Sequence, residues 1–363
     1  MCSMKVFQRF QFHFEPKSGW MNDPNGLVYF KGKYHAFFQH YPHAPHWGQM
    51  HWGHAVSDDL IHWEELPIAL YPDQEYEDDG GCFSGSAVVK DDRLYLFYTS
   101  VSHGLKQTQS VAYSDDGIHF TKYHGNPVIA ANPLGHPDFR DPKVTYLDGK
   151  YYMVVGTGDA TCGKVLLFNS ENLLSWDYSG VLFEGEEFAT CIECPDFFKL
   201  DSKYVLMFSQ IGKTERSTHF VVGDFRDGRL VDYTVQRPEW GPDFYAPQTF
   251  CHDGRRIMIG WMYHWGKNAP EGCQFAGALS IPRELSLVDG RIGNFPVKEA
   301  LTLLSGESKY VRLEGNQLIC SNKAGETVRR DFSDVKSMDI LEDSKSCEVF
   351  LNEGEMSFSW WLE

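Results

Sequence analysis

The apolar positions of this chain recur as short, aromatic-rich runs, and each run follows a tight turn. Five runs begin with a basic residue, and they occupy positions 33–38, 93–98, 150–155, 203–208 and 256–260. Their first residues are 60, 57, 53 and 53 positions apart, and turn pairs such as Lys31-Gly32 and Asp148-Gly149 precede them. Turn residues followed by an apolar run predict a hairpin that leads into a buried strand.

A second pattern repeats in the same frame. A serine or asparagine followed by acidic or amide residues begins it at Ser57, Ser114 and Asn169, with spacings of 57 and 55 residues. Periods of this size are typical of propellers and other repeat folds, and about four strands per unit make a propeller blade. We therefore predict an all-β protein with a five-bladed β-propeller over residues 1–298. A β-sandwich is the alternative, but two patterns in one frame favour the propeller.

The pattern changes after Pro296. Residues 299–363 contain charged, alternating segments, which predict a short C-terminal β domain that is a reduced sandwich. About 60 residues bury little core by themselves. We therefore expect this domain to dock on the propeller or on another subunit, which leaves a homo-oligomer open. The terminal pair Trp360-Trp361 would otherwise form an exposed apolar patch.

Three acidic residues precede three of the five runs by similar distances. Asp23 and Glu193 lie 10 residues before their runs, and Asp141 lies 9 residues before its run. In a propeller the inner strand of each blade lines the central channel. We therefore expect the three carboxylates to meet at one mouth of that channel. Turns between blade strands are the plain alternative for each motif alone, but three motifs in register favour catalysis.

Carboxyl groups gathered in this way are suited to cleaving a glycosidic bond. One ionised group attacks the anomeric carbon or activates water, and one protonated group donates to the leaving oxygen. We expect Arg140, beside Asp141, to hold charge in the cluster. The apolar sequence neighbours of Glu193 suggest a raised pKa that keeps a proton available for donation.

Composition excludes several classes of partner. The formal net charge of −17 argues against nucleic acid and against an anionic membrane surface, because both need a basic face. No apolar stretch approaches the ~20 residues that span a bilayer. Residues 1–9 lack a hydrophobic signal region and there is no Asn-x-Ser/Thr site, so we predict a cytoplasmic protein. Nine scattered cysteines suit free thiols in a reducing compartment.

Two local patterns raise the question of a metal. Segment 39–63 contains His43-x-x-His46 and His51-x-x-His54, but it lacks helix signals and the His-Glu-x-x-His arrangement. Its mixture of histidines and tryptophans better suits sugar rings. The single Cys191-x-x-Cys194 pair is weak as a zinc motif, and buried thiols are the favoured interpretation. We therefore predict no metal and no cofactor, and a small carbohydrate as the partner.

The motifs carry a family resemblance as well. The block Trp20-Met21-Asn22-Asp23-Pro24-Asn25-Gly26 resembles the signature of glycoside hydrolase family 32, the invertases, fructanases and sucrose-6-phosphate hydrolases. Further blocks resemble the family in the same order, at 47–57, 83–86, 139–143, 193–196 and 243–248. The resemblance implies a five-bladed propeller followed by a β-sandwich, and a retaining β-fructofuranosidase that works through a covalent fructosyl-enzyme.

The resemblance also implies a role for each matching residue. Asp23 would be the nucleophile, Glu193 the general acid and base, and Asp141 the residue that binds fructose hydroxyls and stabilises the transition state. Substrate contacts would come from Asn22, Gln39, Trp47, Phe83, Ser84, Arg140 and Trp261. The C-terminal domain departs from the family because it is much shorter than usual, and the shortening lies inside it. The active site should survive this shortening, because every motif lies in the propeller.

Several alternatives remain at this level. An inverting propeller glycosidase for arabinan or xylan is the nearest rival, and the 20–26 block argues against it. A fructosyltransferase on the same fold and a non-catalytic sugar-binding propeller are the others. The choice among sucrose, sucrose 6-phosphate and short fructo-oligosaccharides is open. A phosphate site would need a basic residue near the rim, for which Lys213, Arg216 and Lys267 are loosely placed candidates.

Overall fold

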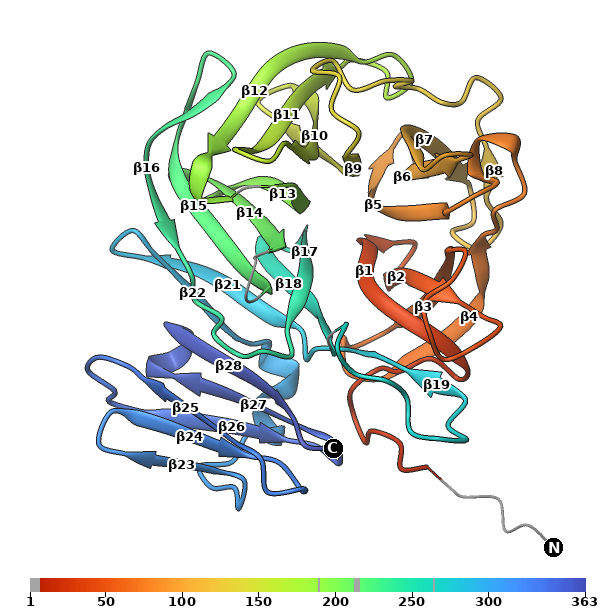
Figure 1. Cartoon of the computed structure of the whole chain (residues 1–363). Coiled ribbons are helices and arrows are strands. Elements are labelled where there is room, and N and C mark those ends of the chain that lie inside the picture. The colour runs from red at the N-terminus through yellow and green to blue at the C-terminus, as the bar shows by residue number, and fades with distance from the viewer. Residues whose placement is uncertain (1–6, 189, 212–215, 264) are drawn as a thin grey trace, which may run out of the picture.

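The computed structural model describes residues 7–188, 190–211, 216–263 and 265–363. Five sheets stand around a common axis like the blades of a propeller, and a smaller β unit lies beside them (Figure 1). Helical structure in these residues is limited to short 3-10 turns, which are η1 (Glu75–Glu77), η2 (Glu186–Phe188), η3 (Lys298–Leu303) and η4 (Asn352–Gly354). None of the helices in the described part of the chain is long and apolar enough to cross a membrane. The five-bladed propeller is confirmed.

Each blade runs outward from an inner strand to an edge strand. The first blade has β1 (Gly19–Phe30), β2 (Lys33–Tyr41), β3 (His51–Ser57) and β4 (Trp63–Leu70), and the second has β5 (Gly81–Lys90), β6 (Arg93–Ser102), β7 (Lys106–Ser114) and β8 (Thr121–Lys122). The third has β9 (Phe139–Leu147), β10 (Lys150–Gly158), β11 (Gly163–Ser170) and β12 (Asp177–Gly185), and the fourth has β13 (Ile192–Leu200), β14 (Lys203–Ile211), β15 (Arg216–Arg226) and β16 (Arg229–Gln236). The fifth has β17 (Tyr245–His252), β18 (Arg255–Met262), β20 (Ala278–Leu279), β21 (Arg283–Val288) and β22 (Arg291–Pro296).

The five apolar runs are the second strands of the blades, and the turns before them are tight hairpins. Both turn residues have positive φ in Lys31-Gly32, at 47° and 82°, and in Asp148-Gly149, at 49° and 87°. Such turns match the twist of the paired strands, and they favour glycine and aspartate. The second strands are buried on both faces because neighbouring blades cover them, which explains their continuous apolar runs. The hairpin prediction is confirmed.

The second repeated pattern is a hydrogen-bonded turn after the third strand of a blade. In the first blade the backbone N–H of Asp59 donates to Ser57 Oγ at 3.1 Å, and that of Ile61 donates to Asp59 Oδ1 at 3.0 Å. The same bonds recur around Ser114 and Ser170 in the next two blades. Serine and aspartate side chains stabilise turns in this way. The repeat in the sequence therefore reflects a turn that the first three blades share.

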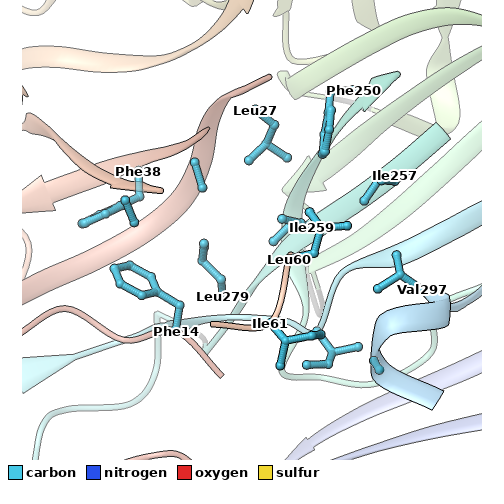
Figure 2. Packing of buried hydrophobic residues seen from close by; sticks show 14 of the residues in the cluster. Phe14, Leu27, Phe38, Leu60, Ile61, Phe250, Ile257, Ile259, Leu279 and Val297 are labelled. Atoms are coloured by element: carbon cyan, nitrogen blue, oxygen red, sulfur yellow. The ribbon is translucent and has the colours of Figure 1, made fainter. Parts of the chain in front are cut away.

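The ring closes between the first and the fifth blade. Strand β19 (Phe275–Ala276), which follows β18 in sequence, pairs in parallel with Gly19 and Trp20 of β1. Figure 2 shows apolar side chains from both blades meeting in one cluster, with Leu27 and Phe38 on one side and Phe250 on the other. Each fully buried side chain of this size contributes roughly 1.5–3 kcal/mol. This cluster therefore holds the first and last blades together.

The C-terminal unit consists of two three-stranded sheets packed face to face. One has β23 (Val311–Glu314), β24 (Gln317–Ser321) and β25 (Thr327–Asp331), and the other has β26 (Met338–Glu342), β27 (Ser346–Leu351) and β28 (Met356–Trp361). Both terminal tryptophans are buried, and Trp361 packs edge-on against Phe10 and Tyr263 of the propeller side. The unit is thus a short sandwich docked on the propeller. Its boundary at residue 298 stays a prediction, although β22 ends at Pro296.

A buried charge network joins the two parts. Arg283 of the fifth blade donates to Glu348 of β27 at 2.5 Å and to Glu239 at 2.6 Å, and all three side chains are buried. His13 lies between Glu348 and Asp343, with ring nitrogens 2.7 Å and 2.9 Å from their carboxylates. Burial disfavours a charged imidazole, but the hydrogen bonds to both acids outweigh it and raise the pKa of His13 to about 9. His13 in this network is therefore charged at neutral pH.

We predict that His13 makes the stability of this protein fall at alkaline pH. Its pKa is higher when folded than the 6.5 of a free histidine, so its stabilisation is fully present below about pH 6.5 and is lost as pH rises through 9. A shift of this size corresponds to about 3 kcal/mol in the free energy of unfolding. Denaturant titrations between pH 6 and 10 should show this loss in the unchanged protein and not in His13→Gln. His103→Gln, at an exposed position, is the matched control. Equal pH slopes for all three proteins would contradict the prediction.

Candidate functional site

The site is built on an irregularity that all five inner strands share. In each of them two residues stand opposite one residue of the neighbouring strand, which makes a β-bulge. The bulged pairs are Asn22-Asp23, Phe83-Ser84, Asp141-Pro142, Cys194-Pro195 and Ala246-Pro247. Proline suits the second position because it has no N–H to leave unpaired in the interrupted ladder. The bulges therefore turn side chains of five strands toward one mouth of the channel.

The predicted acids converge at this mouth, but at successive positions of the bulge. Glu193 directly precedes its bulge, Asp141 is the first residue of its bulge, and Asp23 is the second. The similar distances counted along the sequence conceal this offset, because β1 contains an additional bulge between Asn25 and Val28 and its hairpin with β2 is one residue longer on each strand than those of the third and fourth blades. The carboxyl groups are consequently not equivalent by symmetry. They face one cavity from different places on their strands.

The cavity has a volume of about 370 Å³ and an open mouth. Its lining contains all three predicted acids and most of the predicted binding residues, and comprises Asn22, Asp23, Gln39, Trp47, Phe83, Ser84, Arg140, Asp141, Glu193, Arg216 and Trp265. Volumes of this size are typical of small-molecule sites. The sequence-based grouping of these residues therefore agrees with the structure.

Asp23 has one engaged and one free carboxylate oxygen. Its Oδ2 accepts a hydrogen bond from Ser84 Oγ at 2.7 Å, whereas its Oδ1 is buried without a hydrogen-bond partner among the described residues. Burial raises the pKa of Asp23, and the hydrogen bond from Ser84 opposes that rise. Ser84 thus fixes one oxygen of Asp23, while the other oxygen is buried beside it without such a bond.

Asp141 is held in an unusual backbone conformation. Its φ is 65°, in the left-handed region, and its N–H donates to Thr99 Oγ1 at 2.9 Å. Its Oδ2 accepts a hydrogen bond from the N–H of Cys194 at 2.8 Å. Burial raises the pKa of Asp141 to about 7, although Arg140 acts in the opposite direction. This carboxyl group therefore changes its protonation near neutral pH.

Glu193 lies in a polar environment, which corrects one expectation. Arg140 Nη2 donates to Glu193 Oε1 at 3.0 Å, and the Tyr245 hydroxyl donates to Oε2 at 2.5 Å. Of its apolar sequence neighbours, Ile192 is buried in a cluster between the third and fourth blades, whereas Cys194 has its Sγ 3.6 Å from the carboxylates of Asp23 and Asp141. The expected apolar setting of Glu193 is therefore wrong. Arg140 does place a positive charge in the cluster, but its ion pairs are with Glu193 and Asp138.

Amide and aromatic side chains complete the cavity. The indole N–H of Trp20 donates to Asn22 Oδ1 at 2.8 Å, which fixes the orientation of this amide. Gln39 Nε2 donates to the carbonyl of Cys82 at 2.8 Å. Trp47 is 43% exposed and lies edge-on to Phe83 at 6.1 Å between ring centroids. Fixed amides beside exposed rings suit a ligand with both hydroxyl groups and C–H faces.

The predicted contact Trp261 does not line the cavity. Its side chain is fully buried, and its ring lies edge-on to Trp20 and to Trp265 at 5.8 Å and 5.1 Å. Trp265, four residues later, lines the cavity together with Trp47. The sequence reasoning missed Trp265 and Tyr245. Tyr245 lies inside the 243–248 block that was singled out, so a signal for it was present.

The three basic candidates for a phosphate contact differ in their position relative to the cavity. Arg216 lines the cavity. Lys267 faces a different cavity and forms an ion pair with Asp243 at 3.0 Å. Lys213 lies outside the described residues. Only Arg216 of the three is therefore seen at the site.

Buried histidines in and near segment 39–63 serve the framework. His40 Nδ1 lies 2.8 Å from the carbonyl of Trp20, and His35 Nδ1 lies 3.0 Å from His54 Nε2. Burial lowers the pKa of His54 to about 3, so it is neutral. Among the described residues, no group of histidine, cysteine and acidic side chains has the geometry to hold a metal ion. Cys191 and Cys194 are buried free thiols, as the sequence favoured.

Comparison with known proteins identifies the family. The model of the glycosyl hydrolases family 32 N-terminal domain matches residues 13–296. This chain belongs to glycosyl hydrolase family 32. It is 42% identical to a sucrose-6-phosphate hydrolase of Escherichia coli over 80% of its length, and it spans 65% of that relative. It is also 40% identical to a raffinose invertase of Escherichia coli over 86% of its length, and spans 70% of that protein.

Solved structures of family 32 show the same fold. A β-fructofuranosidase of Bombyx mori, a mutant solved in complex with sucrose, superimposes with a TM-score of 0.88 at 33% identity. The match covers 98% of this chain and 89% of that one. A sucrose-6-phosphate hydrolase of Lactobacillus gasseri gives a TM-score of 0.83 at 26% identity. The family 32 fold therefore extends over the propeller and the short sandwich of this chain.

The titration of Asp141 gives a direct test of the site in the free protein. We predict one aspartate carboxyl that titrates with a midpoint near pH 7, because burial raises its pKa to about 7. Carbon-13 NMR of labelled aspartate carboxyl groups should detect this midpoint and should lose it in Asp141→Asn. In Arg140→Met the midpoint should move higher, since the positive charge that favours ionisation is removed. A folded protein whose aspartates all titrate below pH 5 would overturn this description.

Proposed function

We propose that this protein hydrolyses β-fructofuranosides with retention of configuration. The observation that carries the proposal is the convergence of Asp23, Asp141 and Glu193 in one cavity of a family 32 propeller. Retaining glycosidases use one carboxylate as a nucleophile and a second carboxyl group as acid and then base. Three acids with different partners provide both roles and one further contact for the sugar.

In this proposal Asp23 attacks the anomeric carbon of the fructosyl unit. Ser84 holds the carboxylate through Oδ2, and one of the two carboxylate oxygens would form the covalent bond. The bond from the anomeric carbon to the leaving oxygen breaks, and a fructosyl-enzyme ester results. Water then attacks the same carbon, which releases fructose and regenerates the Asp23 carboxylate.

Glu193 supplies and recovers the proton of these steps. It donates to the leaving oxygen in the first step and accepts a proton from water in the second. Arg140 and Tyr245 hold its two oxygens, so the carboxyl group keeps one orientation through both steps. Asp141 would accept hydrogen bonds from fructose hydroxyls and stabilise the positive charge that develops on the sugar ring.

Sucrose, sucrose 6-phosphate and short fructo-oligosaccharides are the proposed substrates. The names of relatives support this range, since they include sucrose-6-phosphate hydrolases, a raffinose invertase and a levanase. Family membership argues against the arabinan or xylan enzyme, and the intact set of acids argues against a non-catalytic sugar-binding propeller. Transfer of fructose to a sugar acceptor in place of water is the alternative that shares this site.

Two further expectations accompany the proposal. Eight free cysteines in the described residues, most of them buried, support a reducing compartment such as the cytoplasm. The acidic net charge supports a small carbohydrate as partner and no nucleic acid. The docked sandwich covers Trp361, so an oligomer is not needed to bury that side chain.

Substitution of the two principal acids tests their separate roles. Asp23→Asn and Glu193→Gln should each lower kcat for sucrose by roughly 10⁴-fold or more, as the loss of a nucleophile or its proton partner does elsewhere. On β-fructosyl fluoride, whose leaving group needs no proton, Glu193→Gln should still form the fructosyl-enzyme in a burst, and Asp23→Asn should not. The exposed substitutions Asp227→Asn and Glu171→Gln are the controls. Full sucrose hydrolysis by both site variants would refute the assignment.

A substrate panel tests the class of reaction. Sucrose, sucrose 6-phosphate, kestose, inulin and levan should be compared for release of free fructose. In aqueous methanol, a retaining enzyme should transfer fructose to form methyl β-fructofuranoside, which NMR identifies. Formation of the α-anomer would indicate inversion, and oligosaccharides in place of fructose at low substrate concentration would indicate a transferase. Inactivity on the whole panel would refute the proposed function.

A further inference from the structure

Arg216 occupies a distinctive position in the cavity. It begins β15 of the fourth blade, and its guanidinium carbon lies 5.3 Å from the ring centroid of Tyr245 and 5.3 Å from that of Trp265. Planar guanidinium groups are attracted to aromatic faces. Two rings from the neighbouring blade therefore position this side chain at the cavity wall.

The charge of Arg216 has no acidic partner in the described part of the chain. Arg140, the other cation of the cavity, forms ion pairs with Asp138 and Glu193. No ion pair or side-chain hydrogen bond of Arg216 with a described residue is present, although three carboxylates line the same cavity. The N–H groups of its guanidinium are thus available to a ligand.

Tyr245 connects Arg216 to the leaving-group side of the reaction. The hydroxyl of Tyr245 donates to Glu193, and the ring of the same tyrosine lies against Arg216. The general acid must lie beside the oxygen that leaves, because it protonates that oxygen. Arg216 is therefore next to the sugar that departs, and it lies in a different blade from Asp23 and Asp141, which act on the fructosyl unit.

We propose that Arg216 binds a phosphate group on the departing sugar, and so selects phosphorylated disaccharides such as sucrose 6-phosphate. This inference rests on the proposed fructosidase function and specifies its substrate class. A guanidinium group binds phosphate with two parallel hydrogen bonds, and it does so more strongly than it binds neutral hydroxyl groups. The adjacent Trp265, which is 37% exposed, offers a surface for the same sugar.

The specificity ratio is the quantity to measure. The unchanged protein should have a higher kcat/KM for sucrose 6-phosphate than for sucrose, and Arg216→Gln should lower that ratio by about 10- to 100-fold, the range for a lost hydrogen bond to a charged group. The preference should also weaken as salt concentration rises. Arg216→Lys should retain part of the ratio, because it keeps the charge and loses the paired geometry. Arg229→Gln removes an exposed charge from the outer strand of the same blade and should leave the ratio unchanged.

Inhibition of sucrose hydrolysis separates the sources of the phosphate effect. Glucose 6-phosphate should inhibit competitively and much more strongly than glucose, and this difference should disappear in Arg216→Gln. If inorganic phosphate inhibited as well as glucose 6-phosphate, the anion alone would account for binding, and selection of a phosphorylated sugar would be refuted.

Other outcomes would overturn the inference without affecting the proposed function. An unchanged protein that prefers sucrose, or an Arg216→Gln variant that loses activity equally on both substrates, would exclude a phosphate role. An equal loss of activity on both substrates would instead mean that Arg216 binds sugar hydroxyls or holds Tyr245 in place. The proposed function itself fails in a different way, namely if the unchanged protein releases fructose from neither substrate.

Discussion

The bulge in each inner strand is the constraint on which the site depends. A regular strand would point alternate residues into the two neighbouring blades and would leave few side chains directed at the channel mouth. By setting two residues against one, the bulge redirects Asp23, Asp141 and their counterparts toward the axis. The interrupted ladder costs hydrogen bonds, and proline at the second position of three bulges limits that cost.

Buried polar groups between blades keep the five bulges in register. Ser86 of the second blade donates to the carbonyl of Pro142 in the third, and Gln248 of the fifth donates to that of Gly85 in the second. Asp196 accepts from the N–H of Thr249 at 2.7 Å, which joins the fourth blade to the fifth. A buried polar group left without a partner is costly, so these bonds favour a single arrangement of the blades. This arrangement of the blades sets the positions of the acids in the cavity.

The charge of the cavity follows from the same geometry. Burial raises the pKa of Asp23 and of Asp141, and the negative charge of neighbouring carboxylates adds to that effect. Arg140 offsets part of the repulsion but is engaged by Glu193, so Asp141 is free to change protonation near neutral pH. The individual roles of the acids thus depend on partners that come from other blades.

The sequence alone determined the number of blades and the hairpins, and it predicted that three acids meet at one mouth of the channel, because turn residues, apolar periods and motif spacing are local signals. The resemblance of its motifs to family 32 named most of the residues that line the cavity. The tertiary structure decided which tryptophan reaches the cavity, what surrounds Glu193 and which basic residue faces the ligand. Trp261 and Trp265 look alike along the chain, and Arg140 adjoins Asp141 but pairs with Glu193. Such contacts join residues of different strands and blades, and only the closed ring brings them together.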